Sequence, residues 1–479
     1  MRLESLLAEA SVRDLDLLIR VVGEPATEVT AVTMDSRSVA SGAMFACVPG
    51  RVSDGHDFAP AAVADGASAL LCERPLDLDV PQLLVSSVRR ALGPVCDAFF
   101  GHPSQDLTVA AVTGTNGKTT TCAFLSAIFE ANGWRSATIG TLTQQRTTPE
   151  APELHALLAD WRDSGGRAIA MEVSSHALDQ RRTDAVTFAA AVFTNLTTEH
   201  LDYHRTMDAY FEAKAQLFER GRVALAVVNR GDAWGRKLIE RLGDGDSKVE
   251  TFAAEDAVDL HMEPGRSAFS WDGKSVTINL GGSFNVENAL AAAACARGLG
   301  IDTTTVVEGL SSVSGVRGRF ELVQAGQSFT VVVDFAHTPD GLRRVLGAAR
   351  GFGDGRLIAV FGAGGDRDHE KRPLMGAAAS ELADLAVVTS DNPRSEDPTV
   401  IIEQIVAGAA GRAKMIVEED RASAIAAALA VAERGDVVVI AGKGHEQGQE
   451  GLGRTVPFDD VEVAREALLR IQASRQVRE

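Results

Sequence analysis

A glycine-rich stretch followed by lysine and threonine is the part of the sequence best equipped for chemistry. Residues 108–121 read TVAAVTGTNGKTTT. Glycines let backbone N–H groups approach phosphate oxygens, and the N-terminus of a following helix adds partial positive charge. A lysine there, which we expect to be exposed, can reach the outer phosphates of a nucleotide, and a threonine hydroxyl can hold Mg²⁺. The stretch predicts a phosphate-binding loop and an ATP site formed by Gly114, Thr115, Asn116, Gly117, Lys118, Thr119 and Thr120.

The elements on either side of this loop must position it. Residues 108–112 alternate β-branched and small apolar side chains, which is typical of a buried strand. The residues from Lys118 to about Asn132 read as a helix that Gly133 closes. The strict phosphate-loop pattern has glycine where this chain has Val112, so an ordinary strand–helix turn with a surface lysine is the alternative.

Further polar residues follow two other predicted strands, AIAMEVSS (168–175) and AAAVFTNL (189–196). Strands that alternate with helices of about 10–15 residues predict a mainly parallel, doubly wound sheet. Ligands of such sheets bind beyond the carboxyl ends of the strands. Six candidate site residues fall there: Glu172, Ser174, Ser175, His176, Asn195 and His200.

The same patterns divide the chain into three α/β domains. We predict a small mixed α/β N-terminal domain (1–104), a central doubly wound ATPase domain that carries the phosphate loop (105–316) and a C-terminal Rossmann-like domain (317–479). Asp35, Ser36 and Arg37 in the first domain form either a capped turn or part of a binding site. The turn GAGGDRD in the third lacks GxGxxG, so it is only a weak sign of a dinucleotide site.

Composition excludes several classes of protein. The chain has 479 residues, a formal net charge of −19 and a pI near 5.0, which argues against nucleic-acid binding. Its five cysteines are scattered and lack CxxC spacing, which disfavours a disulfide framework or a zinc site and favours the cytoplasm. An acidic N-terminus does not read as a signal peptide, and no apolar run approaches the ~20 residues of a membrane span.

Ten motifs in one order carry a resemblance to a known family. They are GTNGKTT, EVSSHAL, FTNL…EHLDYH, YFEAKAQLF, FNVENALAAA, GVRGRFE, VDFAHTPD, GGDRDHEKRPLM, DNPRSEDP and GKGHE. Together they cover nearly the whole chain, and their order resembles that of the Mur ligases of peptidoglycan synthesis.

The resemblance implies an ATP-dependent ligase that makes an amide from a carboxylate and an amine. ATP and Mg²⁺ take part, and the γ-phosphate activates the D-Glu carboxylate of UDP-MurNAc-L-Ala-D-Glu as an acyl phosphate. No protein nucleophile is needed, because positioning and charge neutralisation suffice. In this family DNPR marks the members that add meso-diaminopimelate, since an arginine fork can hold the distal carboxylate. The expected protein is a cytoplasmic monomer that acts on small molecules.

The resemblance also implies roles for individual residues. Lys118, Glu172, His200 and Lys214 would be catalytic, with Thr119, Glu172, His200 and a carbamylated Lys214 holding Mg²⁺. ATP would further contact Asn288, Arg319, Asp334 and His337, and the UDP substrate would contact Ser36, Thr147, Thr148, Ser175, Gln180 and Arg182. Diaminopimelate would contact Arg367, Asp391, Asn392, Pro393, Arg394, Gly442 and Glu446.

The chain departs from the family pattern at a few positions. Glu199 stands where aspartate is usual, Phe335 replaces tyrosine, Ala363 replaces cysteine, and the loop at residues 143–146 is short. Alternatives for the function are an L-lysine-adding ligase, a folylpolyglutamate synthase and a non-catalytic paralogue. The folylpolyglutamate substrate would not require DNPR, and a paralogue without activity would have lost Lys118, His200 or Lys214.

Overall fold

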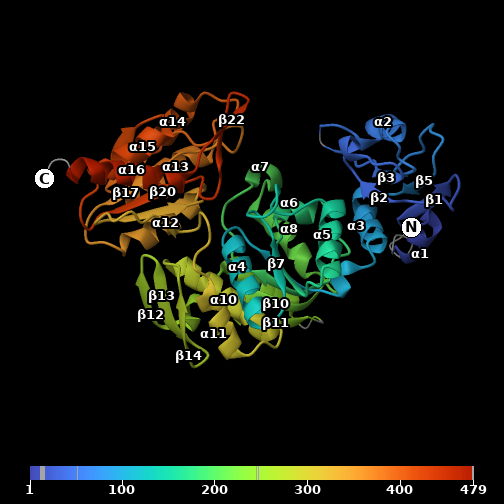
Figure 1. The fold of residues 1–479 in the computed structure, drawn as a ribbon, viewed down its shortest axis with the longest axis horizontal. Coiled ribbons are helices and arrows are strands. Elements are labelled where there is room, and N and C mark those ends of the chain that lie inside the picture. Colours follow the sequence, from blue (N-terminus) through green and yellow to red (C-terminus); the bar gives the residue numbers. More distant parts are fainter. Residues whose placement is uncertain (11–16, 51, 244, 246, 477–479) are drawn as a thin grey trace.

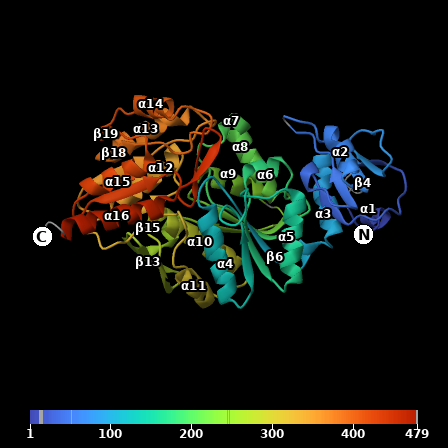
Figure 2. The same ribbon diagram turned by 45° about the horizontal axis from the view of Figure 1, so that its top comes forward.

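Five β-sheets organise the part of the chain that the structure, a computed structural model, describes: residues 1–10, 17–50, 52–243, 245 and 247–476. Three α/β units follow one another along the long axis of the molecule, with the N-terminal unit at one end and the C-terminal unit at the other (Figure 1, Figure 2). The three-domain α/β architecture predicted from the sequence is confirmed.

The N-terminal unit is built on a five-stranded sheet with the order β1-β5-β4-β3-β2, in which only β1 runs antiparallel to its neighbour. Apolar side chains of β3 and β4 are fully buried, and the long helix α3 covers one face. The elements are α1 (Leu3–Glu9), β1 (Leu18–Val22), β2 (Ala31–Thr33), η1 (Ser36–Ser38), β3 (Ala43–Ala46), η2 (Gly55–Phe58), α2 (Ala59–Ala64), β4 (Ala69–Cys72), β5 (Gln82–Val85), α3 (Val88–Phe99) and η3 (Pro103–Gln105).

The central unit contains a six-stranded, all-parallel sheet with the order β11-β10-β9-β6-β8-β7. Helices cover both faces of this sheet, which confirms the doubly wound prediction (Figure 1). Its elements are β6 (Thr108–Thr113), α4 (Lys118–Ala131), β7 (Ser136–Ile139), α5 (Ala151–Asp163), β8 (Ala168–Glu172), α6 (Ser175–Asp179), β9 (Phe188–Phe193), α7 (Leu201–His204), α8 (Met207–Ala215), η4 (Gln216–Phe218), β10 (Val223–Asn229), α9 (Ala233–Leu242), β11 (Lys248–Phe252) and η5 (Ala254–Asp256).

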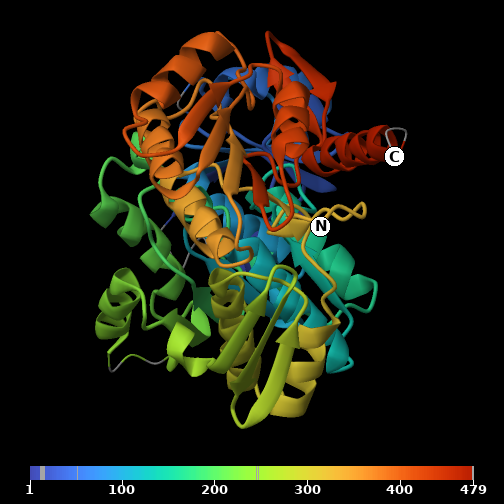
Figure 3. The same cartoon turned by 90° about the vertical axis from the view of Figure 1, so that its left-hand side faces the viewer.

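A small antiparallel sheet and two helices complete the central unit. The sheet, β12-β13-β14, packs against the same core as α4, α10 and α11. Figure 3 shows this sheet beside α10 and α11. The bounds are β12 (Val258–Glu263), β13 (Arg266–Trp271), β14 (Lys274–Ile278), α10 (Ser283–Gly298) and α11 (Thr303–Ser312).

The C-terminal unit repeats the layered plan around a six-stranded sheet with the order β15-β16-β20-β17-β18-β19, parallel except for β15. Apolar clusters fill both faces. Its elements are β15 (Glu321–Leu322), β16 (Thr330–Asp334), α12 (Pro339–Arg350), β17 (Leu357–Phe361), α13 (Lys371–Leu382), β18 (Leu385–Val388), α14 (Pro398–Ala407), β19 (Lys414–Val417), α15 (Arg421–Val431), β20 (Val437–Ala441), β21 (Gly448–Gly451), β22 (Arg454–Pro457) and α16 (Asp460–Gln476).

Several local predictions differ from the structure. The helix expected over residues 208–220 ends at Ala215 and continues as a short 3-10 turn. Helix α11 was not predicted, because TTTVVEGLSS is rich in β-branched residues with low helix propensity; Asp302 caps its first turn. The hairpin β21–β22 was also missed, since its exposed, glycine-containing strands show no apolar alternation. In the described part of the chain no helix is long and apolar enough to cross a bilayer.

A buried histidine lies where the N-terminal unit meets the central unit. His155 of α5 is fully buried, with its Nδ1 3.6 Å from Asp97 Oδ1 of α3 and its Nε2 3.3 Å from the Asp184 carbonyl oxygen. Asp97 also contacts His102, at 2.6 Å. Burial lowers the pKa of His155, and the Asp97 charge opposes this only in part.

We expect this histidine to make the stability of the protein pH-dependent. The folded pKa lies below that of the unfolded chain, so between the two values the unfolded chain binds more protons. The free energy of unfolding should therefore fall as the pH drops below ~6.5, by at most ~1.4 kcal/mol per pH unit for this one group. Thermal unfolding of His155→Leu from pH 5.5 to 8 should show a shallower dependence than that of wild type. The exposed His261→Leu serves as control; identical pH slopes for wild type and His155→Leu would contradict this assignment.

Candidate active site

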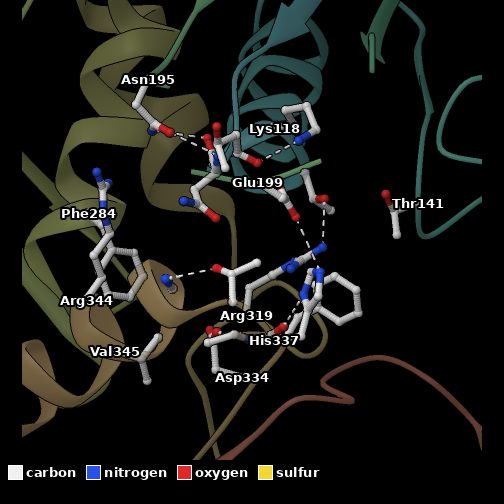
Figure 4. A pocket seen from close by; sticks show the side chains of 18 of the residues that line it. Lys118, Thr141, Asn195, Glu199, Phe284, Arg319, Asp334, His337, Arg344 and Val345 are labelled. Carbon is white, nitrogen blue, oxygen red and sulfur yellow. Dashed lines mark hydrogen bonds and ion pairs between the residues drawn. The ribbon is translucent and has the colours of Figure 1, made fainter. Parts of the chain in front are cut away.

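A cavity of about 480 Å³ lies between the central and C-terminal units. Figure 4 shows Lys118 and Glu199 on one side of it and Arg319, Asp334 and His337 on the other. The cavity brings together residues predicted for ATP, for metal and for the amine. Among those that line it are Thr115, Asn116, Gly117, Lys118, Thr119, Thr120, Glu172, His200, Asn288, Arg319, Asp334, His337, Thr147, Arg367, Asp391, Asn392, Arg394, Gly442 and Glu446.

Two glycines give the phosphate loop its shape. Gly114 and Gly117 have φ values of 144° and 89°, which side-chain-bearing residues rarely adopt. A Cβ atom on Gly114 would lie 1.9 Å from Thr194 Oγ1, and one on Gly117 would lie 2.2 Å from Asn288 Oδ1. The turn can therefore form only with glycine at both positions, and it delivers the chain into α4 at Lys118.

Neighbouring strands and helices hold the loop in place. The backbone N–H groups of Thr115 and Asn116 donate to the main-chain and side-chain oxygens of Asn195, at 2.9 and 3.0 Å. Lys118 Nζ donates to the carbonyls of Gly114 and Thr115, at 3.0 and 2.8 Å. The sequence indicated an exposed lysine, but Lys118 is half-buried because its ammonium folds over these two carbonyl oxygens.

Lys214 of α8 reaches the same loop from inside the protein. Its side chain is 1% exposed, and its Nζ donates to the Gly114 carbonyl at 2.8 Å. Burial lowers its pKa well below the usual value, and the nearby positive charge of Lys118 acts in the same direction. Burial therefore favours the neutral amine, the form that reacts with CO₂.

An acidic group lies beside the loop at the end of β8. Glu172 is 2% exposed, and its carboxylate accepts hydrogen bonds from Thr119 Oγ1 at 3.0 Å and from the Thr141 N–H at 2.8 Å. His200 lines the same cavity, and burial lowers its pKa to about 4, so its imidazole is neutral near pH 7. A hydroxyl, a carboxylate and a neutral imidazole thus border one space.

Glu199 links the central and C-terminal units across the cavity. Its Oε1 lies 3.4 Å from His337 Nε2, and its Oε2 lies 3.7 Å from His200 Nε2. Burial alone would raise the pKa of Glu199, but His337, His200 and Lys118 together hold it below the usual range. The Glu199 side chain therefore contacts His337 on the opposite unit.

The other residues predicted to contact ATP come from α10 and the third unit. Arg319 Nη2 donates to Thr119 Oγ1 at 3.1 Å, and its guanidinium lies 4.5 Å from the centroid of the Phe335 ring. The Asp334 carboxylate accepts from the backbone N–H groups of Phe320 and Ala336, at 2.7 and 2.8 Å. Asp334 therefore also has a structural role, since it ties the segment that enters the third unit to β16.

Most residues predicted for the UDP substrate form one connected group. Thr147 Oγ1 lies 3.1 Å from Thr141 Oγ1, and Thr148 Oγ1 donates to the Glu172 carbonyl at 2.9 Å. Arg182 donates to the Thr148 carbonyl at 2.9 Å and to Gln180 Oε1 at 2.7 Å. Ser175 Oγ lies 2.9 Å from His204 Nε2. Ser36 stands apart on the N-terminal unit, in a turn where Asp35 accepts from the Arg37 N–H, so the turn is capped and a binding role of Ser36 stays a prediction.

The DNPR segment lies on the opposite side of the cavity, after β18. Arg394 adopts a φ of 54°, and its guanidinium contacts Glu450 Oε2 at 3.1 Å and the Gly365 carbonyl at 2.7 Å. Asn392 Nδ2 donates to Glu446 Oε2 at 2.8 Å. Asp391 is 7% exposed, and within the described residues its Oδ2 has no hydrogen-bond partner. Of the residues predicted for the amine, only Pro393 is not part of the cavity wall.

A fully buried arginine braces this segment. Arg372 of α13 binds both carboxylate oxygens of Glu396, at 2.9 and 2.8 Å, and Gln404 at 2.8 Å. It also donates to the Gly364 carbonyl at 3.2 Å. The Arg372 guanidinium therefore links the loop after β17 to the loop that carries Arg394 and holds the two loops together.

Several residues in and around the cavity were not predicted. Lys443 is fully buried and donates to Asn392 Oδ1 at 2.8 Å and to Glu446 Oε2 at 3.0 Å; its spacing of three residues from Glu446 was the available signal. Glu450 comes from the unpredicted hairpin β21–β22. Three other wall residues had no local signal, because only tertiary packing brings them to the cavity: Thr141, Arg344 and Val345. Phe284 and Lys371 lie within quoted motifs, but no site role was predicted for them.

Comparison with known proteins identifies the class. Three family models match in the same order along the chain: the Mur ligase family catalytic domain at residues 28–99, the Mur ligase middle domain at residues 112–296 and the Mur ligase glutamate ligase domain at residues 318–444. The chain belongs to the Mur ligase family, whose members are ATP-dependent ligases that form carbon–nitrogen bonds.

Individual relatives match this chain over nearly its full length. A UDP-N-acetylmuramoyl-L-alanyl-D-glutamate–2,6-diaminopimelate ligase of Streptomyces coelicolor is 44% identical over 93% of each chain. The ligase of the same name from Bacillus cereus is 41% identical over 94% of this chain and 96% of its own. A solved structure of a ligase of this name is 34% identical, covers 95% of this chain and 98% of its own and superposes with a TM-score of 0.67.

Proposed function

We propose that this protein joins meso-diaminopimelate to UDP-MurNAc-L-Ala-D-Glu at the expense of ATP, in peptidoglycan synthesis. The observation that carries the proposal is the single cavity that has the phosphate loop on one unit and the DNPR segment on another. The names of the full-length relatives support the same substrates. The five cysteines are free and buried, which favours a reducing compartment such as the cytoplasm. A single chain supplies both sides of the cavity, which is consistent with a monomeric enzyme.

The proposed reaction has two steps. An oxygen of the D-Glu side-chain carboxylate attacks the γ-phosphorus of ATP, ADP leaves, and an acyl phosphate forms. The amine of diaminopimelate then attacks the acyl carbon, the bond from that carbon to the phosphate oxygen breaks, and phosphate leaves as the amine loses a proton. Lys118 neutralises the transferring phosphate, and Arg319, which contacts Thr119, adds positive charge from the third unit.

The residues beside the loop fit Mg²⁺. Thr119 Oγ1 and Glu172 Oε1 lie 3.0 Å apart, and hard oxygen donors are the ligands that Mg²⁺ prefers. We assign Thr119, Glu172 and His200 to one such ion and a carbamylated Lys214 to a second, and these ions would offset the negative charge of the phosphates.

The amine subsite carries charges that complement meso-diaminopimelate. Arg394 offers a guanidinium to the distal carboxylate. Asp391 Oδ2, which has no hydrogen-bond partner among the described residues, can accept from an ammonium group. L-Lysine lacks the distal carboxylate, so it would leave Arg394 without this partner. This contrast is the physical basis for preferring diaminopimelate over the L-lysine alternative.

Amine choice tests the proposal. Losing one partner of a buried, hydrogen-bonded charge pair costs ~2–5 kcal/mol, so meso-diaminopimelate should be preferred over L-lysine by about 30-fold to several thousandfold in kcat/KM. The measurement is product formation with each amine under the same conditions. Arg394→Lys should lose much of this preference, because lysine cannot bind a carboxylate bidentately. Equal use of the two amines by wild type would overturn the substrate assignment.

A further inference from the structure

Three arginines converge on one buried carboxylate near the N-terminal unit. Glu150, whose side chain is 8% exposed, lies 2.7 Å from Arg89 Nη1, 3.5 Å from Arg146 Nη1 and 3.0 Å from Arg182 Nε. Arg89 comes from α3 of the N-terminal unit, whereas the other two belong to the central unit. Three positive charges surround one negative charge, so the cluster has a surplus of two positive charges.

The three arginines differ in how far other protein groups engage them. Arg182 is bound to the Thr148 carbonyl and to Gln180 as well as to Glu150, and its side chain is only 12% exposed. Arg89 makes the shortest contact with Glu150, and its side chain is 27% exposed. Arg146 makes the longest contact, and its side chain is 57% exposed. Arg146 is therefore the member of the cluster best placed to bind a ligand.

Arg146 lies between two parts of the proposed substrate site. It immediately precedes Thr147, which lines the central cavity. It also acts on the N-terminal unit: Asp35, beside Ser36, has its pKa lowered to about 2, chiefly by Arg37 and in smaller part by the charge of Arg146. The short loop at residues 143–146 thus places a cation next to Thr147 in the chain and within electrostatic reach of the turn that carries Ser36.

The order of groups along the substrate indicates which of them lies near Arg146. The D-Glu carboxylate has to reach the phosphate loop, so the opposite, nucleotide end of the substrate extends toward Ser36 on the N-terminal unit, which is predicted to contact the same substrate. The diphosphate joins uridine to the sugar, so it has to lie between these two points. Its two negative charges equal the surplus of the arginine cluster, and arginine is well suited to phosphate oxygens.

We propose that Arg146, oriented by Glu150, binds the diphosphate of the nucleotide-sugar substrate. Arg89 reinforces the positive field and ties the N-terminal unit to the site through Glu150. This assignment rests on the proposed function, and it makes Arg146 a substrate-binding residue of the short loop.

The test compares wild type with Arg146→Gln on two substrates. With UDP-MurNAc-L-Ala-D-Glu, the variant should show a KM for this substrate raised about 10- to 100-fold, as expected for the loss of a charged hydrogen bond. Its KM values for ATP and for diaminopimelate and its thermal unfolding should stay close to wild type. With MurNAc-L-Ala-D-Glu, which lacks the diphosphate, wild type and variant should have equal KM values. Arg146→Lys should fall between wild type and Arg146→Gln.

Two controls keep the result specific. Arg236→Gln removes an exposed charge from α9 of the same unit and should leave every KM unchanged. If the wild-type enzyme makes no product from UDP-MurNAc-L-Ala-D-Glu, the proposed function is refuted. That outcome is distinct from a failure of the inference about Arg146. With active wild type, an unchanged KM in Arg146→Gln would overturn the inference, and so would an equal loss on both substrates, because the cluster would then bind the peptide end.

Discussion

Replacing Lys118 with alanine should lower the rate of amide formation about a hundred- to a thousandfold, the loss typical of one preorganised charge-stabilising group. Lys118 is the first residue of α4, lines the cavity and has its ammonium 2.8 Å from the Thr115 carbonyl oxygen. Without it, the charge that builds up on the transferring phosphate loses its nearest protein cation. Steady-state release of phosphate and of ligated product measures the effect.

Stability should change much less than activity in this variant. The two hydrogen bonds from Lys118 to loop carbonyls are half-buried, and such bonds contribute ~0.5–1.5 kcal/mol each. Thermal unfolding should therefore shift by a few degrees at most. Lys237→Ala, which removes an exposed lysine of α9 paired with Asp208, is the control and should keep full activity. An active Lys118→Ala enzyme would contradict the proposed mechanism.

Replacing Lys214 with alanine should remove most of the activity, and small carboxylates should restore part of it. Lys214 is buried against the phosphate loop, and its lowered pKa favours the neutral amine, the form that can take up CO₂. The resulting carbamate is an anion that can help to hold Mg²⁺, whereas an ammonium would repel it. Formate or acetate can occupy the space left by the side chain and replace the lost negative charge.

The rescue experiment has a matched control within the same loop. Activity of Lys214→Ala is measured against the concentration of formate or acetate, and Lys118→Ala is measured in parallel. Carboxylates should stimulate only Lys214→Ala, because Lys118 supplies a positive charge that an anion cannot replace. A fully active Lys214→Ala enzyme, together with an unbranched Lys214 in crystals grown with bicarbonate and Mg²⁺, would exclude Lys214 from the mechanism.

Structural features that follow from short stretches of sequence could be predicted. The strand before Gly114, the helix from Lys118 and the alternation that builds both large parallel sheets follow from periodicity and turn chemistry, and the structure confirms them. The order of the ten motifs pointed to the Mur ligase family, and the family models match along the same chain. The roles of individual site residues stay predictions that the experiments above test.

Features that depend on distant parts of the chain were not predictable. Glu450 meets Arg394 only because an exposed hairpin with no apolar alternation packs on the DNPR loop. The contacts of Glu199 with His337 and of Arg146 with Glu150 depend on where loops end in space, and neither local composition nor spacing encodes that. The half-burial of Lys118 was not predictable either. It depends on loop carbonyl oxygens whose positions follow from the turn that Gly114 and Gly117 form.

The central claim is that the carboxylate is activated as an acyl phosphate within this cavity. UDP-MurNAc-L-Ala-D-Glu labelled with ¹⁸O in the D-Glu side-chain carboxylate, incubated with the enzyme, ATP and meso-diaminopimelate, tests it most directly. If the carboxylate oxygen attacks the γ-phosphate and the amine then breaks the bond from carbon to oxygen, one ¹⁸O atom must appear in the phosphate released per amide formed. Mass spectrometry of the phosphate should show this one-to-one transfer. Amide formation in which the departing ¹⁸O appears in water or in AMP, and not in phosphate, would contradict the account.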